Sequence, residues 1–358
     1  MMILTLAIFL LIYLALCFYV GYNAFVWLKE VFSFRYKKAY IACMAFIALN
    51  IFIDRFVSSK VLAFISGMWL LIIGYGLIIL PIANLIYYFS KKKGLKLIGW
   101  AIVVFFIFVF SIGSYNAWNP VVRTYEVSID KPSKQKELTI LLASDFHIGK
   151  MVGKNHLERF VKIAKERQPD IILMPGDIID DYIEPFLEGN LGETMKKLKA
   201  PLGVYATSGN HDYYGDDLAQ LFVEMEGAGI TMLSDEAVNM NDSFYIVGRN
   251  DLTDRNRKSI KEIVAPLNNE KPIIMLDHQP NALAEASENG VDLLLSGHTH
   301  GGQVAPANFI TNRIYENDWG YLKKENLHSI VTSGFGFWGP PFRIGTRSEV
   351  VEIKMHFQ

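Results

Sequence analysis

The 358-residue sequence predicts an α/β domain preceded by an all-α transmembrane region. Two observations support this. Apolar residues dominate the first third of the chain, and charged residues become frequent only from Asn119 onward. Beyond that point, short apolar runs alternate with helical patterns, which is typical of an α/β fold with helices on both faces of a sheet. We therefore expect a membrane region at 1–118 and a water-soluble domain at 119–358.

Composition excludes several classes of protein. The net charge of −1 gives no reason to expect a nucleic-acid partner. The two cysteines, Cys17 and Cys43, both lie in the apolar region, and they form neither a disulfide framework nor a zinc-ligand pattern. The hydrophobic fraction of 51% is high for a soluble enzyme, and the excess lies before Asn119.

Four apolar segments are candidates for membrane spans: Ile3–Val26, Ala39–Ile53, Val61–Phe89 and Leu97–Ile112. A span needs about 20 predominantly apolar residues. Ala39–Ile53 is bounded by Lys38 and interrupted by Asp54 and Arg55, so it is either a span or an interfacial helix. We expect four spans. Because no charge inside these segments suggests a transport path, the region reads as an anchor rather than a channel.

Basic residues between the segments predict the orientation in the cell membrane. They lie between the first and second segments (Lys29, Arg35, Lys37, Lys38) and between the third and fourth (Lys91, Lys92, Lys93, Lys96). Basic loops stay in the cytoplasm, so four spans predict a domain outside the cytoplasm. If Ala39–Ile53 does not cross, the parity changes and the domain is expected in the cytoplasm.

In the domain, apolar runs of four to six residues predict strands, and a period of 3.6 predicts helices. Strands are expected at Tyr125–Ile129, Thr139–Ala143, Asp170–Met174, Gly203–Thr207, Phe244–Val247, Pro272–Leu276, Val291–Leu295, Ser329–Thr332 and Glu349–Met355. Helices are expected at Asn155–Arg167, Leu191–Leu198, Leu218–Gly227, Ser259–Leu267 and Ala282–Glu288. Asn155 is a candidate N-cap. The segment Gln303–Arg347 reads as rich in loops.

Five of the strand runs end in residues that can bind metals. These residues are Asp145 and His147, Asp177, Asn210 and His211, His278, and His298 and His300. Ligands of open α/β sheets bind beyond the carboxyl ends of the strands. Each residue alone has an ordinary explanation as a turn or surface residue. However, five of the eight histidines fall at strand ends, which indicates a shared site.

The chemistry of this set predicts two cations. Apart from His211, it offers two carboxylates, one amide oxygen and four imidazoles, which suit Mn, Fe or Zn better than Ca or Mg. Seven ligands exceed the need of one transition ion but fit two ions that share a bridging carboxylate. Two ions about 3.5–4 Å apart stabilise the attacking and leaving oxygens of a phosphoryl displacement.

The motif series resembles that of the calcineurin-like metallophosphoesterases. It runs Asp145-x-His147, Gly176-Asp177, Gly209-Asn210-His211-Asp212, His278 and Gly297-His298-x-His300, in the same order as in that family. The helical leader followed by this domain is similar to the YkuE-like branch, whose members are transmembrane proteins with a metallophosphoesterase domain. The resemblance covers Thr139 to about the end of the chain and implies a four-layer α/β/β/α sandwich.

The resemblance also implies a role for each site residue. One ion would be held by Asp145, His147, Asp177 and His300. The other would be held by Asp177, Asn210, His278 and His298, with Asp177 as the bridge. His211 would act with Asp177 in catalysis, as an imidazole that is not a ligand and serves the leaving oxygen, and Asp212 would orient it. Asp180 and Asp181 read as loop residues.

Three functions remain open at this stage. The first is a membrane-anchored, metal-dependent phosphoesterase acting on a lipid-linked phosphoester or pyrophosphate. The second is a pyrophosphatase of the UDP-2,3-diacylglucosamine hydrolase type, which needs a cytoplasmic site. The third is a non-catalytic metal-binding or sensing module, against which the intact ligand set argues. The apolar stretch Phe335–Phe342 reads as a folded corner or as a lip for a lipid chain, with Arg343 available for phosphate.

Overall fold

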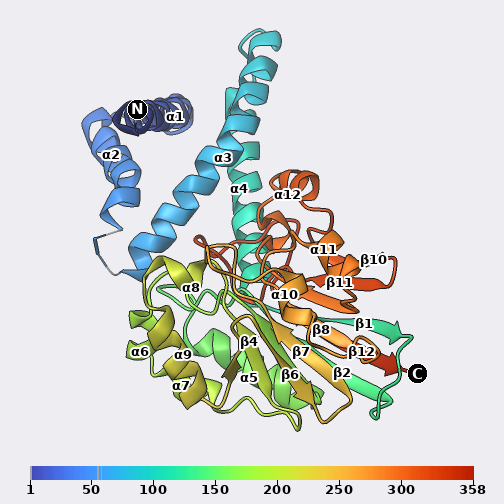
Figure 1. Ribbon diagram of the computed structural model, residues 1–358. Helices are drawn as coiled ribbons and strands as arrows, with labels where there is room; N and C mark the ends of the chain where they lie inside the picture. Colours follow the sequence, from blue (N-terminus) through green and yellow to red (C-terminus); the bar gives the residue numbers. More distant parts are fainter. Residues whose placement is uncertain (1, 55, 58) are drawn as a thin grey trace. The chain divides into compact units, whose positions relative to one another are not determined.

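The computed structural model describes residues 2–54, 56–57 and 59–358 (Figure 1). The chain divides into two compact units, which we describe separately. One comprises residues 1–112 with 339–341, and the other comprises residues 113–338 with 342–358.

The first unit contains long apolar helices. They are α1 (Met2–Phe32), α2 (Lys37–Ile53), α3 (Lys60–Phe89) and the greater part of α4 (Leu95–Trp118). Three helices are long and apolar enough to cross a membrane: Leu4–Phe32, Lys60–Phe89 and Leu95–Trp118. The expectation of four spans is therefore corrected to three candidates in the described chain. The remaining helix, α2, has 17 residues and is about 26 Å long, shorter than the hydrocarbon core of about 30 Å.

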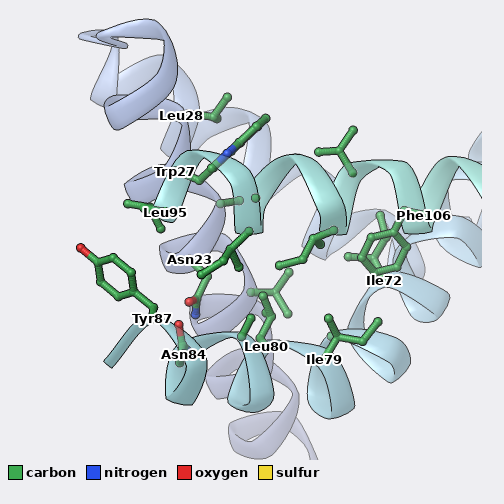
Figure 2. A pocket seen from close by; sticks show the side chains of 18 of the residues that line it. Asn23, Trp27, Leu28, Ile72, Ile79, Leu80, Asn84, Tyr87, Leu95 and Phe106 are labelled. Carbon is green, nitrogen blue, oxygen red and sulfur yellow. The ribbon is translucent and has the colours of Figure 1, made fainter. Parts of the chain in front are cut away.

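A cavity of about 370 Å³ lies among α1, α3 and α4 of this unit (Figure 2). Aliphatic and aromatic side chains dominate its lining, and Asn23 and Asn84 are its few polar members. Both amides are tied to Tyr19: Asn23 donates to its backbone carbonyl at 2.9 Å, and Asn84 donates to its hydroxyl at 3.0 Å. The cavity is therefore a largely apolar space in which both amide side chains already have partners.

The second unit is built on two six-stranded sheets. The first has the order β1 (Val121–Ile129), β12 (Glu349–Phe357), β2 (Glu137–Leu142), β3 (Ile171–Pro175), β4 (Val204–Thr207), β5 (Thr231–Met232). The second has the order β10 (Gly320–Lys324), β11 (Leu327–Val331), β9 (Leu293–Ser296), β8 (Ile273–Leu276), β7 (Phe244–Gly248), β6 (Glu236–Met240). Strands β2 to β5 run parallel to one another, as do β7, β8, β9 and β11.

Three hydrophobic cores separate four layers. The strands of the two sheets pack face to face through side chains such as Ile140 and Leu295. The outer face of the first sheet packs against α5 (Lys154–Arg167), α7 (Leu191–Met195) and α9 (Leu218–Gly227). The outer face of the second sheet packs against α10 (Ile260–Val264) and α11 (Leu283–Glu288). The short helices α6 (Glu184–Glu188) and α8 (His211–Tyr214) lie in the connections. The predicted α/β/β/α sandwich is confirmed.

The elements missed from the sequence are those without a buried apolar run. In β10, half-buried and exposed positions alternate, and its sequence Gly-Tyr-Leu-Lys-Lys ends in two lysines. The region Gln303–Arg347, expected to be rich in loops, also contains the short helix α12 (Asn308–Ile314) and β10, which were not predicted. The strand expected at Ser329–Thr332 is present as β11, with shifted bounds. Helix α5 begins after Gly153, so Asn155 is not its N-cap. Edge strands and short helices bury little surface, and their patterns are correspondingly weak.

Candidate metal centre

The seven predicted ligands follow five parallel strands, at the edge where the carboxyl ends of both sheets meet. Asp145 and His147 follow β2, Asp177 follows β3, Asn210 follows β4, His278 follows β8, and His298 and His300 follow β9. A hydrogen bond of 2.9 Å from His278 Nδ1 to the carbonyl oxygen of Pro175 joins the ends of β8 and β3. The structure therefore brings together residues that are up to 155 positions apart in the sequence.

Most of these ligands adopt left-handed backbone conformations. The φ angles are +53° at Asp145, +46° at His147, +53° at Asp177, +71° at His298 and +51° at His300. A non-glycine residue in such a region costs on the order of 1 kcal/mol and persists only where its surroundings hold it. Here the surroundings include backbone hydrogen bonds: Asp145 N–H donates to Gly176 and His147 N–H donates to Asp177, each at 3.1 Å. The sharp turn after each strand directs the side chain into the site.

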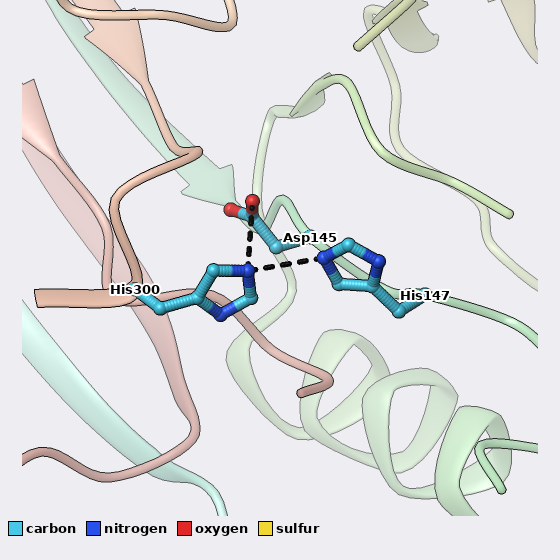
Figure 3. A group of neighbouring side chains, drawn as sticks. All are labelled: Asp145, His147 and His300. Carbon is cyan, nitrogen blue, oxygen red and sulfur yellow. Dashed lines mark hydrogen bonds and ion pairs between the residues drawn. The ribbon is translucent and has the colours of Figure 1, made fainter. Parts of the chain in front are cut away.

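The first ligand group consists of Asp145, His147 and His300 (Figure 3). His300 Nε2 lies 3.5 Å from Asp145 Oδ1 and 3.0 Å from His147 Nε2. All three residues are buried. Two imidazole nitrogens and a carboxylate oxygen that converge in this way form a mixed set suited to a transition-metal cation.

The second group consists of Asp177, His278 and His298, with Asn210 beside it. Because His278 Nδ1 donates its proton to a carbonyl, its Nε2 presents a lone pair. That atom is buried without a hydrogen-bond partner in the described chain, and it lies 3.2 Å from Asp177 Oδ2. Burial acts to lower the pKa of His278, but the carboxylate of Asp177 raises it well above its ordinary value. The space between these two atoms therefore favours a positive charge, which either a proton or a metal cation can supply. His298 Nδ1 lies 2.9 Å from Asn210 Oδ1.

A single carboxylate connects the two groups. Asp177 Oδ2 is 3.6 Å from His147 Nε2 in the first group and 3.2 Å from His278 Nε2 in the second. Its other oxygen accepts a hydrogen bond of 2.9 Å from the backbone N–H of His211, which fixes the plane of the carboxylate. The side chain of Asp177 is 2% exposed, so solvent does not compete with these contacts.

Burial and neighbouring charges shift the pKa values of several groups in the site, and the shifts of Asp177 and His300 favour cation binding. Burial alone would raise the pKa of Asp177, but the neighbouring imidazoles, chiefly that of His278, lower it below its ordinary range. Burial lowers the pKa of His300 well below its usual value, and the nearby groups of His147 and Arg343 add to this effect. An ionised carboxylate and a neutral imidazole are the states in which these groups bind cations.

His211 lies beside the ligands but has a different set of contacts. Its Nδ1 is 2.5 Å from Asp181 Oδ1 and 3.8 Å from Asp180 Oδ1, and its ring centroid is 4.7 Å from that of His147. Burial acts to lower the pKa of His211, but the hydrogen bond to Asp181 and the nearby carboxylates raise it above its ordinary value. Because Nδ1 is committed to Asp181, the ring offers Nε2 as its second nitrogen.

Two expectations about the neighbours of His211 are corrected. The carboxylate of Asp212 does not contact the imidazole; it accepts the backbone N–H groups of Gly209 and Ile179, at 2.8 and 3.0 Å, and thereby shapes the loop. Asp181, expected as an ordinary loop residue, is the group that holds the imidazole. Sequence reasoning missed it because Asp-Asp after a strand is a common turn, and its left-handed φ of +69° is visible only in the structure.

Arg343 does not face an opening through which phosphate could enter. Its side chain is fully buried. Its Nη2 donates to the carbonyl of Gly336 at 2.7 Å and lies 3.0 Å from His300 Nδ1. Burial lowers the pKa of Arg343 to about 10. This geometry makes Arg343 a positioning residue behind a predicted ligand, in place of the substrate contact expected from the sequence.

The apolar stretch Phe335–Phe342 is mostly a folded corner. Phe335, Phe337 and Phe342 are at most 2% exposed, and Phe335 packs against Phe146 and neighbouring rings. Trp338 differs: it is 57% exposed, and its ring centroid lies 6.1 Å from that of His211. An exposed aromatic residue thus borders the site at the position of the proposed catalytic imidazole.

Two groups of nitrogen and oxygen ligands joined by one carboxylate, on a four-layer sandwich, define a dinuclear metallohydrolase-type centre. Residues 138–302 match the calcineurin-like phosphoesterase family. An uncharacterized metallophosphoesterase of Aquifex aeolicus is 32% identical over 65% of this chain and 90% of its own length. The chain belongs to the calcineurin-like phosphoesterase family, whose members use a dinuclear metal site.

One further relative is named a transmembrane protein, and another matches nearly the full length of the chain. A transmembrane protein with metallophosphoesterase domain from Danio rerio is 32% identical over 65% of this chain. The match covers 57% of that relative, so the chain spans a little over half its length. An uncharacterized metallophosphoesterase of Helicobacter pylori is 27% identical over 99% of this chain and 98% of its own. Together with the three apolar helices, the name of the Danio rerio relative supports a membrane protein.

Proposed function

We propose that the chain is a membrane-anchored phosphoesterase that depends on two metal ions and hydrolyses a phosphoester or pyrophosphate bond. The observation that carries the proposal is the position of Asp177 Oδ2, within 3.6 Å of an imidazole nitrogen of each ligand group. A carboxylate shared in this way supports two cations at the spacing that phosphoryl displacement requires.

The proposal assigns a role to each group. One ion is held by Asp145, His147, Asp177 and His300, and the other by Asp177, Asn210, His278 and His298. When bound, the two cations polarise the phosphoryl group and stabilise charge on the attacking and leaving oxygens. His211 donates a hydrogen bond or a proton to the leaving oxygen through Nε2, and Asp181 holds the ring in place. The donor set favours Mn, Fe or Zn.

We further propose that the substrate is borne by the membrane. The support is the anchor: three helices able to span a bilayer are joined to a domain that contains a complete ligand set. Such a tether keeps the site close to phosphoesters carried by lipids. It does not prevent dissolved phosphoesters from reaching the site by diffusion. A pyrophosphatase of the UDP-2,3-diacylglucosamine hydrolase type is one member of this substrate class.

Full-length protein in lipid nanodiscs tests the proposal directly. We expect faster hydrolysis of a lipid-linked phosphoester than of a soluble phosphoester with the same head group, and complete loss of both activities after treatment with a chelator. Addition of Mn²⁺, Fe²⁺ or Zn²⁺ should restore them. Equal turnover of the two substrates would end the lipid assignment. Stoichiometric metal binding without any turnover would instead identify a non-catalytic sensing module.

We also propose that the domain faces the cytoplasm of the cell membrane. With α1, α3 and α4 as spans, the chain crosses three times, so the domain shares its side with the α1–α3 connection, which carries Lys29, Arg35, Lys37 and Lys38. The α3–α4 loop on the opposite side is also basic, but the first helix usually sets the orientation. A fluorescent protein fused after Gln358 should therefore fold and fluoresce, whereas a secreted phosphatase reporter at that position should stay inactive. The reverse result would restore the four-span topology.

A further inference from the structure

Helix α12 presents its apolar side chains outward. Phe309, Ile310 and Ile314 are 74%, 62% and 66% exposed. The helix belongs to the second unit and begins eight residues after the last predicted ligand, His300. Single exposed apolar residues are common, but three large ones on one short helix form a patch that requires an explanation.

The opposite face of α12 is polar and is held by the domain. The hydroxyl of Thr311 donates to Asp318 Oδ2 at 2.8 Å, and the amide of Asn312 donates to Asp318 Oδ1 at 3.3 Å. A surface helix of a water-soluble protein shows the reverse arrangement, with its apolar stripe against the core. The domain thus holds α12 by polar contacts and leaves its apolar face toward the surroundings, as in helices that lie in a membrane interface.

Contacts within the second unit connect α12 to the end of the candidate span α4. The last turns of α4 pair with the segment 343–348: Arg343 N–H donates to the carbonyl of Gly113, and Ser348 N–H donates to that of Asn116, at 2.9 and 3.0 Å. The same segment pairs with the residues that lead into α12, since Ala305 N–H donates to the carbonyl of Ile344 at 2.8 Å. Neighbouring paired segments are about 5 Å apart. The last turns of α4, the segment 343–348 and the residues that lead into α12 are thus three successive neighbours. If α4 spans the membrane, its end lies at the membrane surface, and α12 lies close to that surface too.

From these contacts we infer that α12 is an interfacial helix that inserts Phe309, Ile310 and Ile314 into the surface of the membrane that anchors this chain. Arg313, which is exposed beside them, suits the phosphates of the lipid head groups. Three side chains of this size offer at most about 600 Å² of contact, less than the roughly 800 Å² that each partner buries in a stable protein interface. The bilayer therefore fits the patch better than a second protein does.

Both α12 and the segment before it lie next to residues of the metal centre. Tyr315, which ends α12, has its ring centroid 6.1 Å from that of His298. Gln303, in the segment before α12, exchanges two hydrogen bonds with the backbone of Trp338, the exposed neighbour of His211. Insertion of α12 would place the rim of the site at the lipid head groups. This consequence rests on the proposed function, whereas membrane contact by α12 does not.

Depth measurements on the full-length chain in nanodiscs test the inference without an activity assay. In a background that carries Cys17→Ala and Cys43→Ser, a polarity-sensitive fluorophore is attached at Ile310→Cys and, separately, at Ile314→Cys. The control is Val223→Cys on α9, where the native side chain is 67% exposed. We expect nitroxide lipids to quench the labels at 310 and 314 at least about twofold more than the label at 223, together with a blue-shifted emission.

Each outcome has a defined meaning. Equal quenching at 310, 314 and 223 would overturn the inference. A blue shift that rises with protein concentration and is insensitive to nitroxide lipids would also overturn it, because it would mean that another protein covers α12. Strong quenching without any phosphoesterase activity would preserve the inference and reject the proposed function. Ile310→Glu should reduce turnover of a lipid-linked phosphoester about tenfold relative to a soluble one at unchanged metal content.

Discussion

Asp177→Asn is expected to remove both metal ions and nearly all hydrolytic activity. The substitution preserves the shape of the side chain but replaces one carboxylate oxygen by an amide nitrogen, which cannot ligate a cation. Since Oδ2 lies between His147 Nε2 and His278 Nε2, at 3.6 and 3.2 Å, both ligand groups lose the same charged partner. We expect turnover to fall by about 10³-fold or more, which corresponds to about 4 kcal/mol of lost transition-state stabilisation. Metal analysis and steady-state kinetics on the same preparation measure both effects.

A matched control separates this effect from the loss of any buried carboxylate. Asp292 is also buried, and it pairs with Lys131 at 2.7 Å, at the start of β9 and away from the ligands. Asp292→Asn should leave metal content and turnover close to those of the parent protein, even if it lowers thermal stability. An Asp177→Asn protein that retained two ions and parental turnover would show that no bridging carboxylate is needed here, and the dinuclear assignment would have to be abandoned.

His211→Ala is expected to reduce turnover by about 10²–10⁴-fold while both metal ions remain bound. The imidazole is committed through Nδ1 to Asp181, at 2.5 Å, and not to either predicted cation. Its removal therefore deletes a proton or hydrogen-bond donor and keeps the ligand set. The loss should be largest for substrates with basic leaving groups, which need a proton most, and small for activated aryl esters. Loss of metal in this variant would refute the assigned role.

Asp181→Asn provides the companion test. It keeps a hydrogen-bonding side chain next to His211 Nδ1 but removes the charge that orients the ring. We expect a decrease of about tenfold in turnover, with a KM close to that of the parent protein. Combined with His211→Ala, the second substitution should add little, because the two residues act as one unit. Additive effects would mean that Asp181 acts elsewhere, for example through its neighbour Asp180, which lies 3.4 Å from His147 Nδ1.

The ligand set could be predicted from the sequence because each ligand is marked by the few residues that precede it. Each ligand follows a run such as Ile140–Leu142 or Ile171–Met174, whose continuous apolar character marks a strand buried on both faces. The positions of Asp145 and Asp177 relative to these strand ends needed no knowledge of the rest of the chain. The meeting of the strand ends at one edge follows from the general geometry of parallel sheets. The fold class could be predicted for the same reason.

The helical leader shows where local reasoning reaches its limit. Hydropathy identified α1, α3 and α4 as candidate spans, but the status of Ala39–Ile53 depended on a difference of a few residues. The side of the membrane on which the domain lies depends on that single segment. Composition alone could not decide it, because the loop before α2 and the loop between α3 and α4 are both basic.

Strand positions, motif order and the dinuclear ligand chemistry were thus encoded in short stretches of sequence. Three other properties arise from contacts between distant residues. They are the burial of Arg343 behind His300, the hydrogen bond between Asp181 and His211, and the exposure of the apolar side chains of α12. A charged residue such as Arg343 normally predicts a surface position, and only the fold surrounds it with carbonyl acceptors and places an imidazole beside it. Likewise, the neighbours of a seven-residue helix determine which of its faces meets the core. The periodicity of seven residues alone does not predict that face.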